Sequence, residues 1–227
     1  MLSGFLDKVT ISGVMMKALL AAGLLAGLLI APLSHAKDID EGIEYQLVTP
    51  PVRTSSDNNK VEVVELFWYG CPHCYHFEPK LNAWKKKQGK NIQFVRIPAV
   101  FPNHPAWELH ARAYYTADLL GILDKIHGPL FDAIQKDRGR LANPAALAKF
   151  FAKYGVDKAT FNDTLYSFGV QMKVNRAQEL TKRYQVDGVP TLIIAGRYRT
   201  HASLTNGQAG LLKVMDYLVK KASKPGK

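Results

Sequence analysis

The sequence contains two cysteines, Cys71 and Cys74, which are separated only by Pro72 and His73. A disulfide between them would close a very small loop and would stabilise the fold little through chain entropy. A thiolate, by contrast, attacks disulfides and binds metals, and its abundance depends on the pKa of the thiol. We therefore expect this pair to carry out chemistry rather than to cross-link the fold.

The residues around the pair predict a strand followed by a helix. Residues 61–68 are nearly all apolar and rich in valine and aromatic side chains, which is typical of a strand covered on both faces. Gly70 allows the backbone to turn, and Pro72 suits the first position of a helix. An apolar helical face follows at spacings of four and three, formed by Phe77, Leu81 and Trp84. Cys71 would thus lie at the helix N-terminus, where unpaired backbone N–H groups stabilise a thiolate.

This placement predicts different roles for the two sulfurs. Cys71 is expected to be the attacking cysteine, and Cys74, one turn further into the helix, the more buried partner. His73 lies in the first turn, where its dipole or positive charge favours the Cys71 anion; the alternative is a solvated residue without effect. Stabilising the anion also stabilises the dithiol relative to the disulfide, so the disulfide would oxidise other thiols readily.

The rest of the chain alternates between strand and helix patterns. Strands are expected at residues 45–48 and 92–97, and the second of these completes a strand-helix-strand unit with parallel strands. A helical block then extends to about residue 184. A strand at 189–194, a tight turn at Ala195-Gly196, a returning strand and a final amphipathic helix follow. This order predicts an α/β fold interrupted by helices.

Punctuating residues divide the helical block. Gly128-Pro129 is expected to begin a new short helix, and Asn143-Pro144 and Asp157 are expected to cap two others. Side chains expected to point inward after the last cap are Phe161, Leu165 and Phe168.

The N-terminal region has the layout of an export signal. A short basic segment, Met16-Lys17, precedes an apolar stretch and the small-x-small sequence Ser34-His35-Ala36. We expect cleavage near Ala36 and a translation start at Met15 or Met16, because the upstream residues fit no signal layout. The alternative, an uncleaved anchor, is disfavoured because the apolar run is short. Export places the protein in an oxidising compartment, where disulfides persist.

The chain is strongly basic, with a formal net charge of +11. Its lysines and arginines are spread along the sequence, apart from Lys85–Lys87 and the C-terminal tail, and no basic run alternates with aromatic residues. We therefore expect a soluble, basic, exported protein that does not bind nucleic acid.

The motifs resemble those of the DsbA-type disulfide oxidoreductases, which are exported members of the thioredoxin-fold family. The residues that carry the resemblance are Glu65-Leu66-Phe67, Cys71-Pro72-His73-Cys74-Tyr75, Phe77-Glu78 and Gly188-Val189-Pro190. The resemblance implies an α/β thioredoxin fold with an inserted all-helical domain. Residues 1–36 would be the signal peptide, 37–102 and 186–227 the two parts of the thioredoxin-like domain, and 103–185 the insertion.

The resemblance also implies a function. The protein would be a periplasmic monomer that donates its Cys71–Cys74 disulfide to unfolded exported proteins. A DsbB-like, quinone-linked membrane protein would reoxidise it. The redox-active disulfide would be the only redox group, with no metal and no other cofactor.

Three further residues gain expected roles from the resemblance. Pro190 would follow a cis peptide bond and lie against the cysteines, leaving the Val189 backbone free to pair with an extended client. Glu65 would lie beneath the disulfide and influence proton transfer to Cys74, with Arg96 as its partner; the alternative is an edge glutamate that reaches water. Glu78 is expected to be a solvated helix residue.

Other functions remain open at this point. An isomerase or reductase could use the same fold, and a peptide-binding chaperone could retain the disulfide without using it. A structural zinc site normally needs four protein ligands, and no second Cys-x-x-Cys is present. Haem attachment requires Cys-x-x-Cys-His, whereas Tyr75 follows Cys74.

Overall fold

The computed structural model describes residues 39–56, 60–136 and 141–223. The predicted signal segment, residues 1–36, lies outside the described residues. Among those that are described, no helix is both long and apolar enough to cross a membrane.

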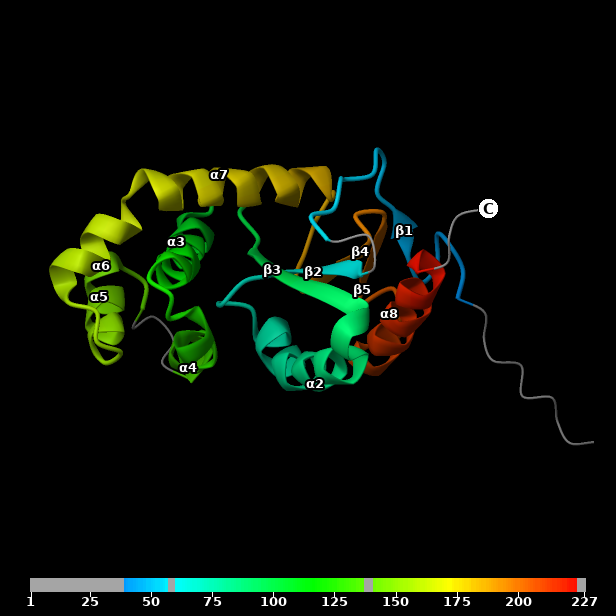
Figure 1. Cartoon of the computed structure of the whole chain (residues 1–227), viewed down its shortest axis with the longest axis horizontal. Helices are drawn as coiled ribbons and strands as arrows, with labels where there is room; N and C mark the ends of the chain where they lie inside the picture. The colour runs from blue at the N-terminus through cyan, green and yellow to red at the C-terminus, as the bar shows by residue number, and fades with distance from the viewer. Residues whose placement is uncertain (1–38, 57–59, 137–140, 224–227) are drawn as a thin grey trace, which may run out of the picture. The chain divides into compact units, whose positions relative to one another are not determined.

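Five strands form one mixed sheet in the order β1-β5-β4-β2-β3 (Figure 1). They are β1 (Gln46–Leu47), β2 (Val61–Phe67), β3 (Ile92–Pro98), β4 (Thr191–Ile194) and β5 (Tyr198–His201). β2 and β3 are parallel, whereas β4 is antiparallel to both β2 and β5. The predicted parallel pair and the predicted late hairpin are therefore confirmed.

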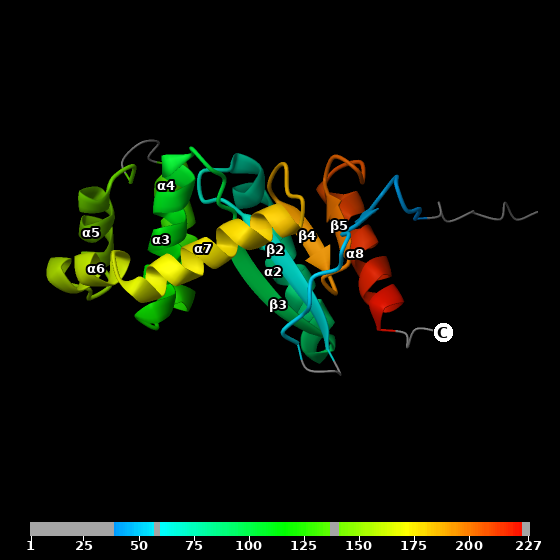
Figure 2. The same ribbon diagram turned by 90° about the horizontal axis from the view of Figure 1, so that it is seen from above.

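Strand β2 lies between β4 and β3, and all of its side chains are buried. Val61 and Val63 pack with α2 (Pro72–Gln88) and α8 (Gln208–Ala222) on one face of the sheet. Val64 and Leu66 join the core on the other face, which the C-terminal part of α7 (Phe168–Arg183) covers (Figures 1 and 2). Burial on both faces explains why β2 is a nearly continuous apolar run.

The helical insertion follows β3 and ends before β4. Its helices are α3 (Pro105–Leu119), α4 (Leu123–Lys136), α5 (Pro144–Ala152), α6 (Lys158–Leu165) and α7. Outside the insertion, a short 3₁₀ helix, Gly89–Asn91, links α2 to β3. The insertion gathers at one end of the sheet, and α7 extends back across it (Figure 2). The predicted caps are confirmed, because Asn143 and Asp157 accept hydrogen bonds from the backbone N–H groups of Ala146 and Thr160, each at 2.9 Å.

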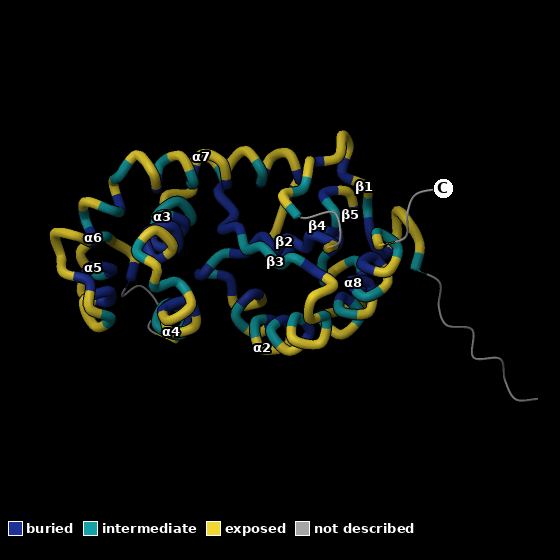
Figure 3. Tube along the Cα trace, in the orientation of Figure 1, coloured by how far each residue is buried: buried dark blue, intermediate teal, exposed yellow. Residues whose placement is uncertain are grey.

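Two expectations about the insertion are wrong. Gly128-Pro129 begins no helix, because α4 runs through it and buries a continuous apolar face containing Ile126 and Leu130. Packing of this face outweighs the missing N–H of the proline. Phe168 is not inward but 79% exposed. Ser167 caps a new helix there, so the buried face of α7 starts instead at Val170. Figure 3 shows exposed positions along the outer side of α7.

Candidate active site

Cys71 is the N-cap residue of α2, and Pro72 occupies the first helical position, as predicted. The Cys71 Sγ accepts a hydrogen bond from the backbone N–H of Cys74 at 3.4 Å. On its other side, the same sulfur lies 3.3 Å from the carbonyl oxygen of Val189. Both cysteines are free thiols in this structure. The Cys71 sulfur therefore lies between the start of α2 and the chain segment that enters β4.

The local environment drives the pKa values of the two thiols apart. A hydrogen bond from the Cys74 side chain lowers the pKa of Cys71 to about 6, against the opposing effect of burial. Backbone N–H groups of Cys74 and His73, and the charge of His73, act in the same direction. Burial raises the pKa of Cys74 well above its ordinary value, and this side chain has no exposed surface. Near neutral pH the pair therefore holds one thiolate and one thiol.

Val189 and Pro190 meet the cysteines from the opposite side of the site. The peptide bond between them is cis, as expected from the resemblance. A cavity of about 680 Å³ lies beside this bond, and its lining includes His73, Pro190, His201 and Gln208. Gln208, at the start of α8, donates a hydrogen bond to the carbonyl of His73 at 3.3 Å. No local pattern pointed to His201 or Gln208, because the fold brings them to this cavity from distant parts of the chain.

A buried ion-pair network lies on the α2 side of β2. Glu65 is only 1% exposed, and its carboxylate accepts a hydrogen bond from Arg96 Nε at 2.9 Å. The predicted pairing is thus confirmed, and the alternative of an edge glutamate is excluded. Arg96 also donates to Glu78, which accepts a second hydrogen bond from Asn82 at 2.9 Å.

Glu78 is therefore not the solvated residue that its helical position suggested. Its side chain is 13% exposed, because this face of α2 packs towards β3. Burial raises the pKa of Glu65. Burial also acts to raise the pKa of Glu78, but the approach of His127 and the charge of Arg96 outweigh it and hold that pKa low. Of the two carboxyl groups, Glu65 therefore retains a proton more readily, and Glu78 is the one that ionises.

Gly70 serves a close approach in the loop before Cys71. A Cβ atom at this position would lie 2.3 Å from the ring of Trp68. That ring stacks on Trp107 of α3, with centroids 4.4 Å apart and an interplanar angle of 9°. The backbone N–H of Cys71 donates to the carbonyl of Trp68 at 3.0 Å. The stacked indoles thus brace the loop that presents Cys71.

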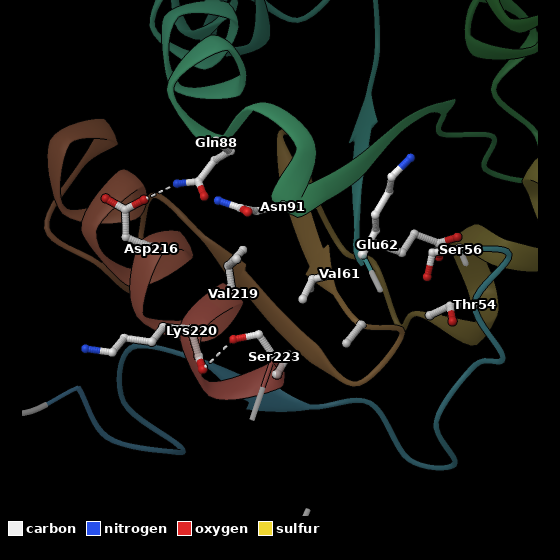
Figure 4. A pocket seen from close by; sticks show the side chains of 13 residues that line it. Thr54, Ser56, Val61, Glu62, Gln88, Asn91, Asp216, Val219, Lys220 and Ser223 are labelled. Atoms are coloured by element: carbon white, nitrogen blue, oxygen red, sulfur yellow. Dashed lines mark hydrogen bonds between the residues drawn. The ribbon is translucent and has the colours of Figure 1, made fainter. Parts of the chain in front are cut away.

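Another cavity, of about 830 Å³, lies away from the cysteines and is lined by polar side chains such as Glu62, Gln88 and Asp216 (Figure 4). Its acidic side chains already have partners. Glu62 accepts from Ser55 at 2.6 Å, and Asp216 accepts from Trp84 Nε1 at 2.8 Å. Within the described parts of the chain, no group of three or more His, Cys, Asp or Glu side chains could hold a metal ion.

A redox pair at a helix N-terminus opposite a cis-proline, on a sheet interrupted by helices, defines a thiol:disulfide oxidoreductase of the thioredoxin fold. Comparison with known proteins is more specific. The model of the DSBA-like thioredoxin domain family matches residues 62–215, and this chain belongs to that family.

Individual relatives agree over nearly their whole length. The chain is 44% identical to the thiol:disulfide interchange protein DsbA of Burkholderia cepacia, over 89% of this chain and 93% of that protein. A crystal structure of Pseudomonas aeruginosa DsbA matches with a TM-score of 0.75 and 41% identity, covering 82% of this chain and 96% of that one. The oxidoreductase DsbA of Xylella fastidiosa matches with a TM-score of 0.72 and 34% identity, covering 79% and 95%. The protein is thus a disulfide oxidoreductase, and the isomerase, reductase and chaperone alternatives are not favoured.

Proposed function

We propose that this protein donates the Cys71–Cys74 disulfide to newly exported, unfolded proteins in the periplasm. It acts as a monomer, uses no metal or other cofactor, and is reoxidised by a DsbB-like, quinone-linked membrane protein. The proposal rests mainly on one observation, which is that the pKa of Cys71 is lowered to about 6 while that of Cys74 is raised. A stable thiolate favours the dithiol and makes the disulfide a strong oxidant.

The exchange proceeds in two steps that balance. A client thiolate attacks Cys71 Sγ, and the bond between the two enzyme sulfurs breaks; Cys74 leaves and takes up a proton. A second client thiolate then attacks the client sulfur of the mixed disulfide and releases Cys71 as a thiolate. The client loses two electrons, and the enzyme pair gains them. Cys71 is the attacked sulfur because it is 8% exposed, whereas Cys74 is fully buried.

Glu65 and His73 support this exchange from opposite sides. Glu65 is buried and close enough to Cys74 for its charge to raise the pKa of that thiol. Because burial also raises the pKa of Glu65 itself, this carboxyl group can supply the proton that Cys74 needs. His73 lies exposed in the first turn of α2 and favours the thiolate of Cys71. Pro72 starts that helix and so places the backbone N–H groups that face the sulfur.

Val189 and Pro190 form the client-binding side. The Val189 carbonyl already points at the reactive sulfur, at 3.3 Å, so its backbone can pair with an extended client whose cysteine replaces this contact. The adjoining cavity of about 680 Å³ accommodates client side chains. Pro190 lacks an N–H and therefore adds no competing donor.

Client oxidation under single-turnover conditions tests the proposal. The oxidised protein is mixed with a reduced, unfolded test protein, and thiols are counted by alkylation over time. We expect one client disulfide per Cys71–Cys74 disulfide consumed, and none with Cys71→Ser. If the client remains reduced while the Cys71–Cys74 disulfide stays intact, the donor function is refuted.

A further inference from the structure

His127 connects the helical insertion to the active-site network. It lies on α4, which packs beside α2, and its side chain is 10% exposed. Its Nδ1 lies 2.8 Å from the hydroxyl of Tyr69, two residues before Cys71. Its Nε2 lies 3.5 Å from Oε1 of Glu78. One buried imidazole thus contacts both the active-site loop and the carboxylate on α2.

These two contacts determine which ring nitrogen of His127 carries the hydrogen. The nitrogen that faces a carboxylate must carry a hydrogen, so Nε2 is the N–H of the neutral imidazole. Nδ1 is then the acceptor, and the Tyr69 hydroxyl donates to it. Burial raises the pKa of Tyr69, so its hydroxyl keeps the proton that this hydrogen bond needs. Tyr69 therefore aims the Nε2–H of His127 at Glu78.

Glu65 and Glu78 share Arg96 but differ in all their other partners. Arg96 donates to both carboxyl groups. Glu78 additionally accepts from Asn82 and is approached by Nε2 of His127 at 3.5 Å, whereas Arg96 is the one hydrogen-bond partner of Glu65 among the described residues. Each carboxylate also has one buried oxygen without a hydrogen bond. In a buried site, ionising both of two carboxyl groups that share one cation costs more free energy than ionising one of them. The extra donors on Glu78 decide which group carries the negative charge.

Charged and titratable groups surround the imidazole on every side. Those that face it are Glu78 and Lys85 from α2, Arg96 from β3, Tyr114 from α3, Tyr69 from the active-site loop, and Asp124 from α4 itself. A cavity of about 460 Å³ borders His127 and all of these residues except Tyr69. Burial is the largest influence on His127 and lowers its pKa, so the ring is neutral at pH 7.

We propose that His127 is a positioning residue for disulfide exchange: with its Nε2–H directed at Glu78 Oε1 from 3.5 Å, it keeps the negative charge on Glu78 and leaves the shared proton on Glu65. The proposal rests on the proposed donor function, because the proton on Glu65 matters only when Cys74 leaves as a thiolate. The helical insertion thereby takes part in the chemistry of the thioredoxin-like part.

The test compares carboxyl titrations by carbon-detected NMR in the reduced parent, His127→Leu, His127→Gln and His110→Leu. His110 is a second buried histidine, on α3, and its side chain forms no ion pair with a carboxylate among the described residues, so it is the matched control. In His127→Leu we expect the titrations of Glu65 and Glu78 to move towards each other by about one pH unit, a tenfold change in proton distribution. His127→Gln, whose amide N–H replaces Nε2–H, should restore the separation.

Client oxidation provides a second readout. In His127→Leu at pH 7 it should slow by up to about tenfold, following the loss of protonated Glu65. Alkylation of reduced Cys71 should keep its rate. Unchanged carboxyl titrations in His127→Leu, or an equal change in His110→Leu, would overturn the proposal.

Two further outcomes are decisive. If His127→Leu does not fold, Tyr69→Phe serves instead, because it removes only the hydroxyl that orients the His127 ring. It should bring the titrations of Glu65 and Glu78 closer together, as expected for His127→Leu. If the difference between these two titrations is unchanged in Tyr69→Phe, the proposal is overturned. If the parent protein itself oxidises no client, the donor function fails, whereas the carboxyl titrations still decide the role of His127.

Discussion

The lowered pKa of Cys71 should make the stability of the reduced protein depend on pH in a way that the oxidised protein cannot share. The thiol titrates at about 6 in the folded state, against an ordinary value of 9.0. A group whose pKa is lower in the folded state stabilises the fold. This stabilisation is complete at pH values above the pKa of the unfolded state, and it disappears as the pH falls through the pKa of the folded state. The relevant window therefore extends upwards from about pH 6, and the disulfide form has no thiol to titrate.

The size of the effect follows from the two pKa values. At pH 7 the folded thiol is mostly ionised and the unfolded thiol is not, which corresponds to about 1.4 kcal/mol. Solvent still reaches the 8% exposed side chain of Cys71 and screens part of its charge, so we expect about 1 kcal/mol. At pH 5 the contribution should be close to zero.

Urea unfolding of both forms, followed by far-UV circular dichroism at pH 5 to 8, measures this contribution. Subtracting the unfolding free energy of the oxidised form from that of the reduced form removes the contributions of the titrating groups that both forms share. It should shift by about 1 kcal/mol in favour of the reduced form between pH 5 and pH 7. Reduced Cys71→Ser should instead follow the profile of the oxidised parent. Parallel profiles of the reduced and oxidised parent would refute thiolate stabilisation by the start of α2.

Three further predictions concern individual side chains. Cys74→Ser should accumulate mixed disulfides with clients through Cys71, seen as reductant-sensitive bands on gels; complexes that form in Cys71→Ser instead would reverse the roles. Pro190→Thr should slow release of clients while Cys71 keeps its alkylation rate, and parent-like complex levels in cells would make Pro190 a simple strand-start residue. Arg96→Leu should destabilise the fold by about 3–5 kcal/mol, because it leaves the negative charge on Glu78 without its buried counter-ion; urea midpoints check this, and a loss below about 1 kcal/mol would contradict the burial argument.

Local sequence patterns predicted the chemistry and most of the elements. The apolar run that became β2 and the proline that starts α2 specify where Cys71 lies, because both depend on neighbours in the sequence. The pairing of Glu65 with Arg96 could be suggested but not decided, because the register that places them opposite each other on adjacent parallel strands is not readable from the sequence.

What the sequence could not predict depends on contacts between distant segments. Glu78 looked solvated because nothing in its own helix shows that β3 brings Arg96 to it. His127 carried no signal, since its partners come from another helix and from the loop before Cys71. The new cap at Ser167 also changed the helical phase and turned Phe168 outward.

The redox equilibrium of the Cys71–Cys74 pair with glutathione tests the central claim most directly. The thiolate at the start of α2 predicts a strongly oxidising pair, with a potential above about −180 mV, the value typical of protein disulfide isomerase. The ratio of dithiol to disulfide can be measured by alkylation after acid quenching across a range of glutathione ratios. A potential near that of thioredoxin, about −270 mV, would contradict the account and assign the protein to reduction rather than disulfide donation.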